Sequence, residues 1–246
     1  MKVTFLGTNG WYDTDTGNTL CILIETKKEY IILDAGGGFY KIGQHIKKKK
    51  PIYLFLSHFH LDHIIGLHTL LLCNFSQGIK LYGPPGVKKY LSQIVNYPYT
   101  ASFSKLKTKV TVNQINKEVR FPFRVEFGKL LHPSLCYGYR FNLEGKTIAY
   151  CTDTGVCGNL YKLAQKVDLL ITECSATSGK KEKDWPHLTA GDAAKVARKS
   201  EVKKLFLVHF NAALFKTEKQ RSIAKAQAKV IFENTFAADD GQIVNL

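Results

Sequence analysis

The sequence lacks several features that would each define a class of protein. No uninterrupted apolar run approaches the roughly 20 residues of a membrane-spanning helix, so we expect no membrane segment. The first residues run directly into an expected strand, without an apolar segment of the signal-peptide type, and we expect a cytoplasmic protein. No C-x-x-C pair occurs among the six cysteines, which we expect to be reduced, mostly buried thiols rather than a disulfide framework.

Linkers and acidic residues are also scarce. No Pro/Gly/Ser-rich stretch, low-complexity tract or short repeat divides the 246 residues, so we expect a single domain over residues 1–246. Lys and Arg number 35 against 20 Asp and Glu, a formal net charge of +15. Such a charge attracts polyanions, so it favours an anionic substrate and leaves nucleic acid open as a partner. A lysine-biased surface that only maintains solubility would carry the same charge.

Short stretches rich in β-branched and aromatic residues indicate strands along the whole chain. Expected strands lie at residues 3–6, 20–25, 30–33, 52–56, 80–82, 109–112, 119–127, 137–143, 147–151, 169–172, 205–208 and 242–246. Helical periodicity is clearest in 190–200 and 222–236, with further candidates at 39–46, 63–72 and 87–95. Thr189-x-x-Asp192 gives the helix at 190 a start similar to a capping box. Both halves of the chain therefore offer strands and helices, as in an α/β protein.

Residues 57–63 hold three imidazoles and a carboxylate directly after an apolar run. Imidazole nitrogens and carboxylate oxygens are ligands that suit zinc, iron or manganese. In an extended stretch His58 and His60 project to the same side and can bind one ion. Asp62 and His63 are adjacent, so they point differently and can serve a second ion. A solvated histidine-rich turn is the alternative, but four such groups at a strand-to-loop junction are too many for ordinary packing.

This motif, His58-x-His60-x-Asp62-His63, resembles the signature of the metallo-β-lactamase superfamily of hydrolases. The resemblance covers essentially the whole chain, and it implies an α/β fold: a four-layer αβ/βα sandwich with two mixed β-sheets flanked by helices. Strands that end in functional groups along one sheet edge are how such sheets build a site. Polar residues follow expected strands in this way at Asp34, His58, Asp153, Glu173 and His209.

The resemblance also implies a site for two divalent metal ions, with seven ligands. One ion would be held by His58, His60 and His132, the other by Asp62, His63 and His209, and Asp153 would join them. Such a site leaves coordination positions open for a water molecule. Two ions would lower the pKa of this water, orient it, and stabilise negative charge on the attacking and leaving oxygens. Zinc is the default metal for this ligand set, although Mn²⁺ or Fe²⁺ would fit it. Asp34 would orient a ligand or the backbone rather than bind metal.

Two further residues favour phosphodiesters as substrates within this superfamily. Glu173 and His187 resemble the Glu–His pair of the tRNA 3′-processing nucleases (the RNase Z type) and of related phosphodiesterases. A poor alkoxide leaving group benefits from a general acid, and an imidazolium held by a carboxylate supplies one. The resemblance thus implies catalytic roles for Glu173 and His187, and for Asp62, which would orient a metal-bridging hydroxide. The structural alternative for His187 is a residue that only neighbours a helix cap.

Two departures argue against tRNA processing. The tRNA nucleases carry a flexible arm after the histidine equivalent to His132, whereas only about twenty residues separate His132 from Asp153 here. The residues after His209 lack the Ser…Arg-Tyr element that clamps phosphate in those nucleases. We therefore expect a dinuclear-metal phosphodiesterase for a small, cyclic or nucleotide-type phosphodiester. Residues 97–99 and 103–109 could line its entrance, although loop packing explains them equally well.

Three alternatives stay open. An acyl hydrolase of the same fold, acting on lactones, thioesters or β-lactams, would not need Glu173 and His187. An RNase Z-type RNA endonuclease that lacks the flexible arm would use the same metal ligands. A nucleic-acid-binding module that keeps metal only for folding would bind without turnover, but structural zinc normally has four closed protein ligands. Homodimers are common in such families, and no interface can be read from the sequence.

Overall fold

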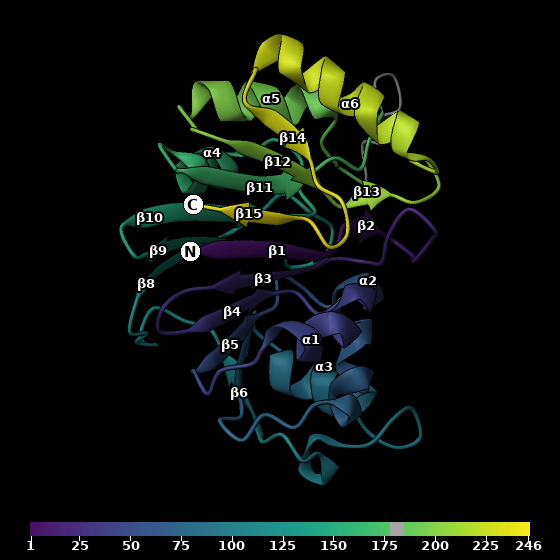
Figure 1. Cartoon of the computed structure of the whole chain (residues 1–246), viewed down its shortest axis with the longest axis vertical. Helices are drawn as coiled ribbons and strands as arrows, with labels where there is room; N and C mark the ends of the chain where they lie inside the picture. Colours follow the sequence, from purple (N-terminus) through teal and green to yellow (C-terminus); the bar gives the residue numbers. More distant parts are fainter. Residues whose placement is uncertain (178–184) are drawn as a thin grey trace.

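The computed structural model describes residues 1–177 and 185–246. Two mixed β-sheets pack face to face in it, and helices cover the outer face of each sheet (Figure 1). The layers follow the order helix, sheet, sheet, helix, which is the αβ/βα sandwich that the sequence predicts. Within the described residues, no helix has the length and apolar character needed to cross a membrane.

The first sheet has seven strands in the order β15-β1-β3-β4-β5-β6-β7. Their bounds are Lys2–Gly7 (β1), Cys21–Glu25 (β3), Tyr30–Leu33 (β4), Ile52–Phe55 (β5), Ile79–Gly83 (β6), Val110–Gln114 (β7) and Ile243–Asn245 (β15). From β4 to β7 the neighbours run parallel, whereas β15, β1, β3 and β4 pair antiparallel. The residues that follow β4 and β5 therefore leave the sheet at the same edge.

The second sheet has six strands in the order β14-β12-β11-β10-β9-β8. Their bounds are Arg124–Lys129 (β8), Tyr137–Leu143 (β9), Lys146–Cys151 (β10), Leu169–Glu173 (β11), Leu205–Val208 (β12) and Thr235–Ala237 (β14). Strands β10, β11, β12 and β14 run parallel, so the residues after β10, β11 and β12 also meet at one edge. A short parallel pair, β2 (Asn9–Gly10) with β13 (Phe210–Asn211), joins the loop after β1 to the segment after β12.

Helices and 3-10 turns form the two outer layers. The first sheet is covered by η1 (Gly37–Lys41), α1 (Ile42–His45), α2 (Leu61–Ile64), η2 (Ile65–Leu72) and α3 (Val87–Ile94), and η3 (Phe103–Lys105) precedes β7. The second sheet is covered by α4 (Gly158–Ala164), α5 (Ala190–Lys199) and α6 (Glu218–Ile231). The predicted capping box begins α5: the backbone N–H of Asp192 donates to Thr189 Oγ1 at 3.1 Å, and its carboxylate accepts from the backbone N–H of Thr189 at 3.2 Å.

Aromatic side chains join the two sheets to each other. The rings of Phe5 and Phe206 stack with centroids 5.1 Å apart, and Phe55 meets Phe141 edge to face at the same distance. The first pair connects β1 to β12 and the second connects β5 to β9. Such contacts are specific in geometry and add to the burial of the rings. They fix how the polar edges of the two sheets lie against each other.

Several expected elements have different bounds in the structure, the helix expected at 63–72 is largely the 3-10 helix η2, and one α-helix was not expected. The strand expected at 119–127 begins only at Arg124, because the apolar residues before it pack against the core between the sheets as an irregular segment. The helix expected at 222–236 ends at Ile231, and Thr235–Ala237 instead pairs with β12 as β14. Helix α4 was not predicted. The six cysteines are free and five of them are buried, as expected.

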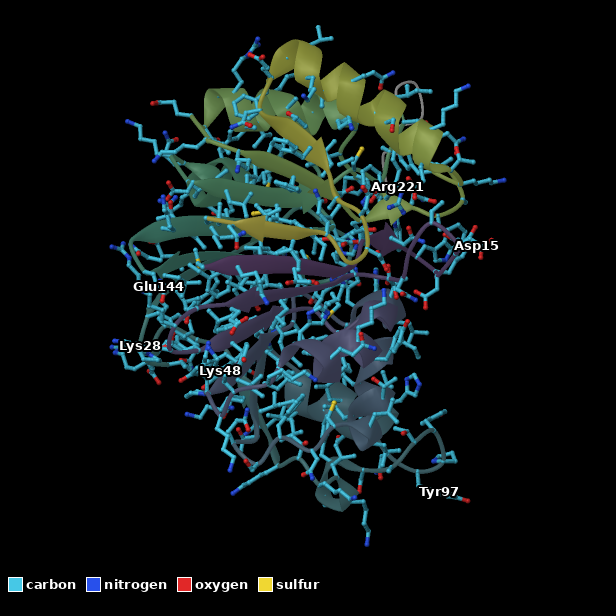
Figure 2. All side chains as sticks on the ribbon, in the orientation of Figure 1. Asp15, Lys28, Lys48, Tyr97, Glu144 and Arg221 are labelled. Carbon is cyan, nitrogen blue, oxygen red and sulfur yellow. The ribbon has the colours of Figure 1, made fainter. Side chains whose placement is uncertain are left out.

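Arg221 of α6 connects the last helix to the loop after β1 (Figure 2). Its buried guanidinium donates hydrogen bonds to Thr8 Oγ1 at 2.9 Å, to Asn9 Oδ1 and to Thr16 Oγ1 at 3.3 Å. The guanidinium carbon also lies 4.8 Å from the centroid of the Phe210 ring. A residue near the end of the chain therefore holds a loop that follows the first strand.

Candidate active site

Polar residues that follow strands of both sheets meet at one edge of the sandwich. Asp34 follows β4, His58 follows β5, Asp153 follows β10 and His209 follows β12. Asp34, Asp153 and His209 have left-handed backbone conformations, with φ of 56°, 49° and 52°. Residues in such conformations cluster at functional sites, where the surrounding structure fixes them. The backbone therefore leaves these strands in a sharp turn that directs the polar residues to a common place.

The first cluster of candidate ligands comprises His58, His60, His132 and Asp153, with one ligand atom of each within 4.8 Å of the others. The centroids of the three imidazole rings lie 4.5 to 4.9 Å apart. Burial disfavours a charged imidazolium, so it lowers the pKa of all three histidines, and that of His58 falls well below its usual value. These imidazoles are neutral near pH 7, which is the form that binds metal.

The second cluster comprises Asp62, His63 and His209, with Asp153 beside it. His63 Nε2 and His209 Nε2 lie 3.1 Å apart, and Asp153 Oδ2 lies 3.1 Å from the former and 3.2 Å from the latter. Burial opposes a charge on His63, but Asp153, Asp62 and Asp34 outweigh it and raise the pKa of His63 well above its usual value. Burial also opposes the charges of Asp62 and Asp153, yet the two histidines lower the pKa of both carboxyls.

Hydrogen bonds from outside the clusters orient the histidines. The Nδ1 of His63 lies 2.7 Å from Oδ2 of the buried Asp34, which also accepts a hydrogen bond of 2.5 Å from the hydroxyl of Tyr150. The Nδ1 of His209 lies 2.8 Å from Ser175 Oγ. Contacts of this kind to one ring nitrogen turn the other toward a metal. Asp34 therefore occupies the orienting position that the sequence predicted for it.

The donor set fits divalent metal ions in two respects. Nε2 of His58 and Nε2 of His132 are buried and have no hydrogen-bond partner in residues 1–177 and 185–246. A buried, unpaired nitrogen costs free energy unless a ligand satisfies it. In the second cluster, His63 Nε2 and Asp62 Oδ2 lie 3.6 Å apart. The Nε2 atoms of His63 and His209 lie 3.1 Å from each other, and their distances to Asp153 Oδ2, and that of His209 to Asp62 Oδ2, are 3.1 to 3.2 Å. Two ligands bound to one zinc at about 2.0–2.2 Å lie roughly 3.3 Å apart, so these spacings suit a shared ion.

A Glu–His pair lies beside the clusters. Glu173, the last residue of β11, is fully buried, and its Oε1 lies 2.8 Å from His187 Nδ1. The backbone N–H groups of Thr154 and Leu188 donate to the same carboxylate at 2.5 and 3.2 Å. Burial opposes protonation of His187, but Glu173 outweighs it and raises the pKa of His187 to about 9. His187 is therefore an imidazolium at neutral pH.

A cavity of about 660 Å³ opens onto both clusters and the Glu–His pair, and Asp62, Asp153, His187 and His209 line it. Two tryptophans, Trp11 and Trp185, also belong to its lining. Residues 97–99 and 103–109 are not among the described residues that line it, which favours loop packing, the alternative that the sequence left open for them. The exposed Tyr97 lies at a far end of the molecule (Figure 2).

Several residues of the site were not predicted from the sequence, among them Trp11, Ser134, Ser175 and Trp185. Ser134 Oγ lies 3.0 Å from His60 Nε2, and the backbone N–H of Trp11 donates to Asp62 Oδ2 at 2.7 Å. Each serine lies two positions after a predicted site residue, and this proximity in the sequence could have indicated that the serines belong to the site. No comparable signal marked the tryptophans, because the folding of distant segments brings them to the site.

Comparisons with known proteins agree with this fold. The family described as "Beta-lactamase superfamily domain" matches residues 30–210. The ribonuclease Z of Synechocystis sp. is 30% identical, over 98% of this chain and 92% of its own length. The metallo-β-lactamase fold protein YhfI of Bacillus subtilis has a TM-score of 0.82 at 22% identity, covering 99% of this chain and 98% of that one. The human short-form tRNase Z has a TM-score of 0.77 at 23% identity, covering 100% and 99%.

The chain therefore belongs to the β-lactamase superfamily, in the metallo-β-lactamase fold class. Within it, the chain belongs to the ribonuclease Z-like branch and is a metal-dependent hydrolase. The family uses divalent metal ions, and the two His/Asp clusters among the described residues could hold such ions.

Proposed function

We propose that this protein is a phosphodiesterase that uses two divalent metal ions to cleave a small, cyclic or nucleotide-type phosphodiester. The Glu173–His187 pair carries the proposal, because it places a protonated imidazole in the same cavity as both clusters of candidate ligands. Bound metal ions, zinc in our proposal, would activate water and stabilise negative charge on the substrate. They would be held by His58, His60 and His132, by Asp62, His63 and His209, and by Asp153 between them.

His187 would donate a proton to the leaving group. An alkoxide leaves slowly unless it is protonated, and His187 stays charged near pH 7 because Glu173 raises its pKa to about 9. Glu173 engages Nδ1, so the Nε2–H is the group available to the substrate. The carboxylate itself is fixed by backbone N–H groups, which keeps the imidazole in place. An acyl hydrolase would not need this pair.

The compactness of the chain supports a small substrate. The alignment with the Synechocystis ribonuclease Z is 304 positions long against 246 residues here, so more than fifty aligned positions have no counterpart in this chain. The segment between His132 and Asp153 is filled by β9 and β10, where the tRNA nucleases that it resembles carry their flexible arm. RNA is the alternative substrate, because the relative is named a ribonuclease and the net charge of +15 suits a polyanion.

Two substrates with different leaving groups test the proposal. Metal-reconstituted protein should hydrolyse bis(p-nitrophenyl) phosphate, whose leaving group needs little protonation, and adenosine 2′,3′-cyclic monophosphate, whose leaving group is an alkoxide. Asp62→Ala should abolish both reactions. His187→Ala should slow the cyclic nucleotide by about 10²- to 10⁴-fold and the activated diester much less. His68→Ala is the matched control, because His68 is an exposed histidine on η2 outside the clusters.

The pH dependence gives a second readout. The acid form of His187 is lost as the pH rises through about 9, so turnover of the cyclic nucleotide should fall there, by about tenfold per pH unit at the limit. The same fall should be absent in His187→Ala. If the protein binds metal fully and cleaves neither diester, the proposal is wrong, and lactones and thioesters become the substrates to screen.

A further inference from the structure

The chain contains two tryptophans, Trp11 and Trp185, and both line the cavity of the candidate active site. They are 66% and 46% exposed. Leu61, which is 60% exposed, lines the same cavity. Each of these large apolar residues keeps between 46% and 66% of its surface in water, so burial in the core does not fully explain its placement at a polar site.

Trp11 is held in an unusual backbone conformation. Its φ is 77°, in the left-handed region, which is an outlier for a bulky residue. This conformation lets its backbone N–H donate to Asp62 Oδ2 at 2.7 Å, a task that glycine or asparagine could perform with less strain. Only Tyr12 contacts the indole among the described aromatic rings, edge to face with centroids 5.3 Å apart. The backbone contact therefore does not account for an indole at this position, and the contact with Tyr12 leaves 66% of Trp11 exposed.

Trp185 is attached to the other side of the site. Its ring is parallel to the imidazole of His60, with an interplanar angle of 5° and centroids 5.8 Å apart, and it meets His132 edge to face at 5.8 Å. Trp185 thus rests on the first cluster of ligands, whereas Trp11 is bonded to Asp62 of the second. The two indoles are consequently anchored to different clusters around one cavity.

We propose that Trp11 and Trp185 bind the nucleobase of the substrate, so that the enzyme acts on base-bearing phosphodiesters and discriminates against base-free ribosyl phosphodiesters. This inference rests on the proposed phosphodiesterase function and names its substrate class. Every nucleobase has a flat π-face, and its stacking on an aromatic side chain contributes about 1–3 kcal/mol. A base-free sugar phosphate is strongly hydrated and gains nothing from an apolar rim. The cavity of about 660 Å³ is in the range of about 300–1,000 Å³ typical of small-ligand sites.

Intrinsic fluorescence tests this directly, because all tryptophan emission of the chain comes from the two residues in question. Zinc-loaded protein is titrated with adenosine 5′-monophosphate and with ribose 5-phosphate, which carries a hydroxyl at C1′ in place of the base. The nucleotide should quench the emission and bind roughly 5- to 150-fold more tightly, the ratio that corresponds to stacking of one base. Trp11→Phe and Trp185→Phe each leave a single emitter and show which indole meets the base.

Kinetics with side-chain deletions provide the second arm. Trp11→Gly keeps the positive φ without strain, and Trp185→Ala removes the other indole. Each should raise KM for adenosine 2′,3′-cyclic monophosphate by roughly fivefold or more while kcat changes little. Tyr97→Ala is the control, because Tyr97 is an aromatic residue that is more exposed than either tryptophan and does not line the cavity, so its loss should leave KM unchanged.

Two results would overturn the inference: equal binding of the two monophosphates, or an unchanged KM in both indole deletions. If either result is obtained while the unmodified protein still cleaves bis(p-nitrophenyl) phosphate, the base-binding role is rejected and the proposed phosphodiesterase function stands. Absence of any phosphodiester cleavage would instead reject the proposed function, and the titration with the two monophosphates would still report whether the indoles recognise a base.

Discussion

The two clusters of candidate ligands differ in how their charges are balanced within the protein itself. In the first, His58, His60 and His132 are neutral, and two of them present buried Nε2 atoms without partners among the described residues. In the second, His63 is an imidazolium surrounded by carboxylates, with Asp34 2.7 Å from one ring nitrogen and Asp153 3.1 Å from the other. One cluster therefore has unsatisfied lone pairs, and the other is already an ion network.

The difference has a thermodynamic meaning. A metal ion in the first cluster would relieve the cost of buried nitrogens that lack a partner. A metal ion in the second would replace favourable contacts between an imidazolium and its carboxylates. The second cluster should consequently contribute more to the stability of the metal-free protein, and the first should gain more from binding.

The largest expected effect comes from the residue that the two clusters share. Asp153→Asn removes the charge that lies beside both, and we expect phosphodiesterase activity to fall below about one thousandth of wild type, since metal-dependent charge stabilisation amounts to several kcal/mol. Metal content, measured by elemental analysis, should fall in step. Asp168→Asn is the control, because Asp168 precedes β11 and pairs with Lys203 at the opposite end of that strand. Full activity in Asp153→Asn would show that the clusters work independently.

Stability of the metal-free protein distinguishes the clusters next. His63→Ala leaves the buried Asp34 and Asp153 and the partly buried Asp62 without their cation, and should cost about 3–5 kcal/mol. His58→Ala opens a cavity but also removes an unpaired nitrogen, so a smaller cost of about 1–2 kcal/mol is expected. Urea denaturation in the presence of a chelator measures both. Equal losses would contradict the contrast drawn between the clusters.

The smallest effect concerns the support of the second cluster. Asp34→Asn should weaken metal binding there by about 10- to 100-fold, as expected when the partner that orients a histidine ligand is lost. Metal binding to the first cluster should be unchanged. In a titration with a chromophoric chelator, the protein should therefore lose its metal in two phases, first from the second cluster and then from the first. Tyr150→Phe removes only one hydrogen bond to Asp34 and should have a milder effect. A parallel loss in both phases would indicate that Asp34 supports the whole site.

Much of the fold, and the gathering of the candidate ligands at one edge of the sandwich, could be predicted because short stretches of sequence carry the signals. The ligands of residues 58–63 are close in sequence, and Asp153 and His209 follow apolar stretches that form buried strands. The errors fall where tertiary contacts decide. Phe232 and Phe236 continue the apolar periodicity of α6, yet Thr235–Ala237 joins the edge of the second sheet because β12 offers it a parallel partner.

The tryptophans illustrate what the sequence could not reveal. Trp11 reaches Asp62 across 51 positions, through a hydrogen bond that depends on its backbone angle rather than its side chain. Trp185 meets His60 by ring stacking, for which no spacing rule exists. Propensity and periodicity describe neighbours along the chain, so contacts of this kind emerge only when both sheets are in place.

The hydrogen bonds of Arg221 also bear on when the enzyme becomes competent during its synthesis. All seven candidate ligands have left the ribosome before residue 221, which lies 213 positions after Thr8. A nascent chain could then possess every ligand while the loop that carries Trp11 still lacks its support from α6. Assembly of the finished pocket would then wait until α6 packs against this loop, after all seven candidate ligands have been synthesised.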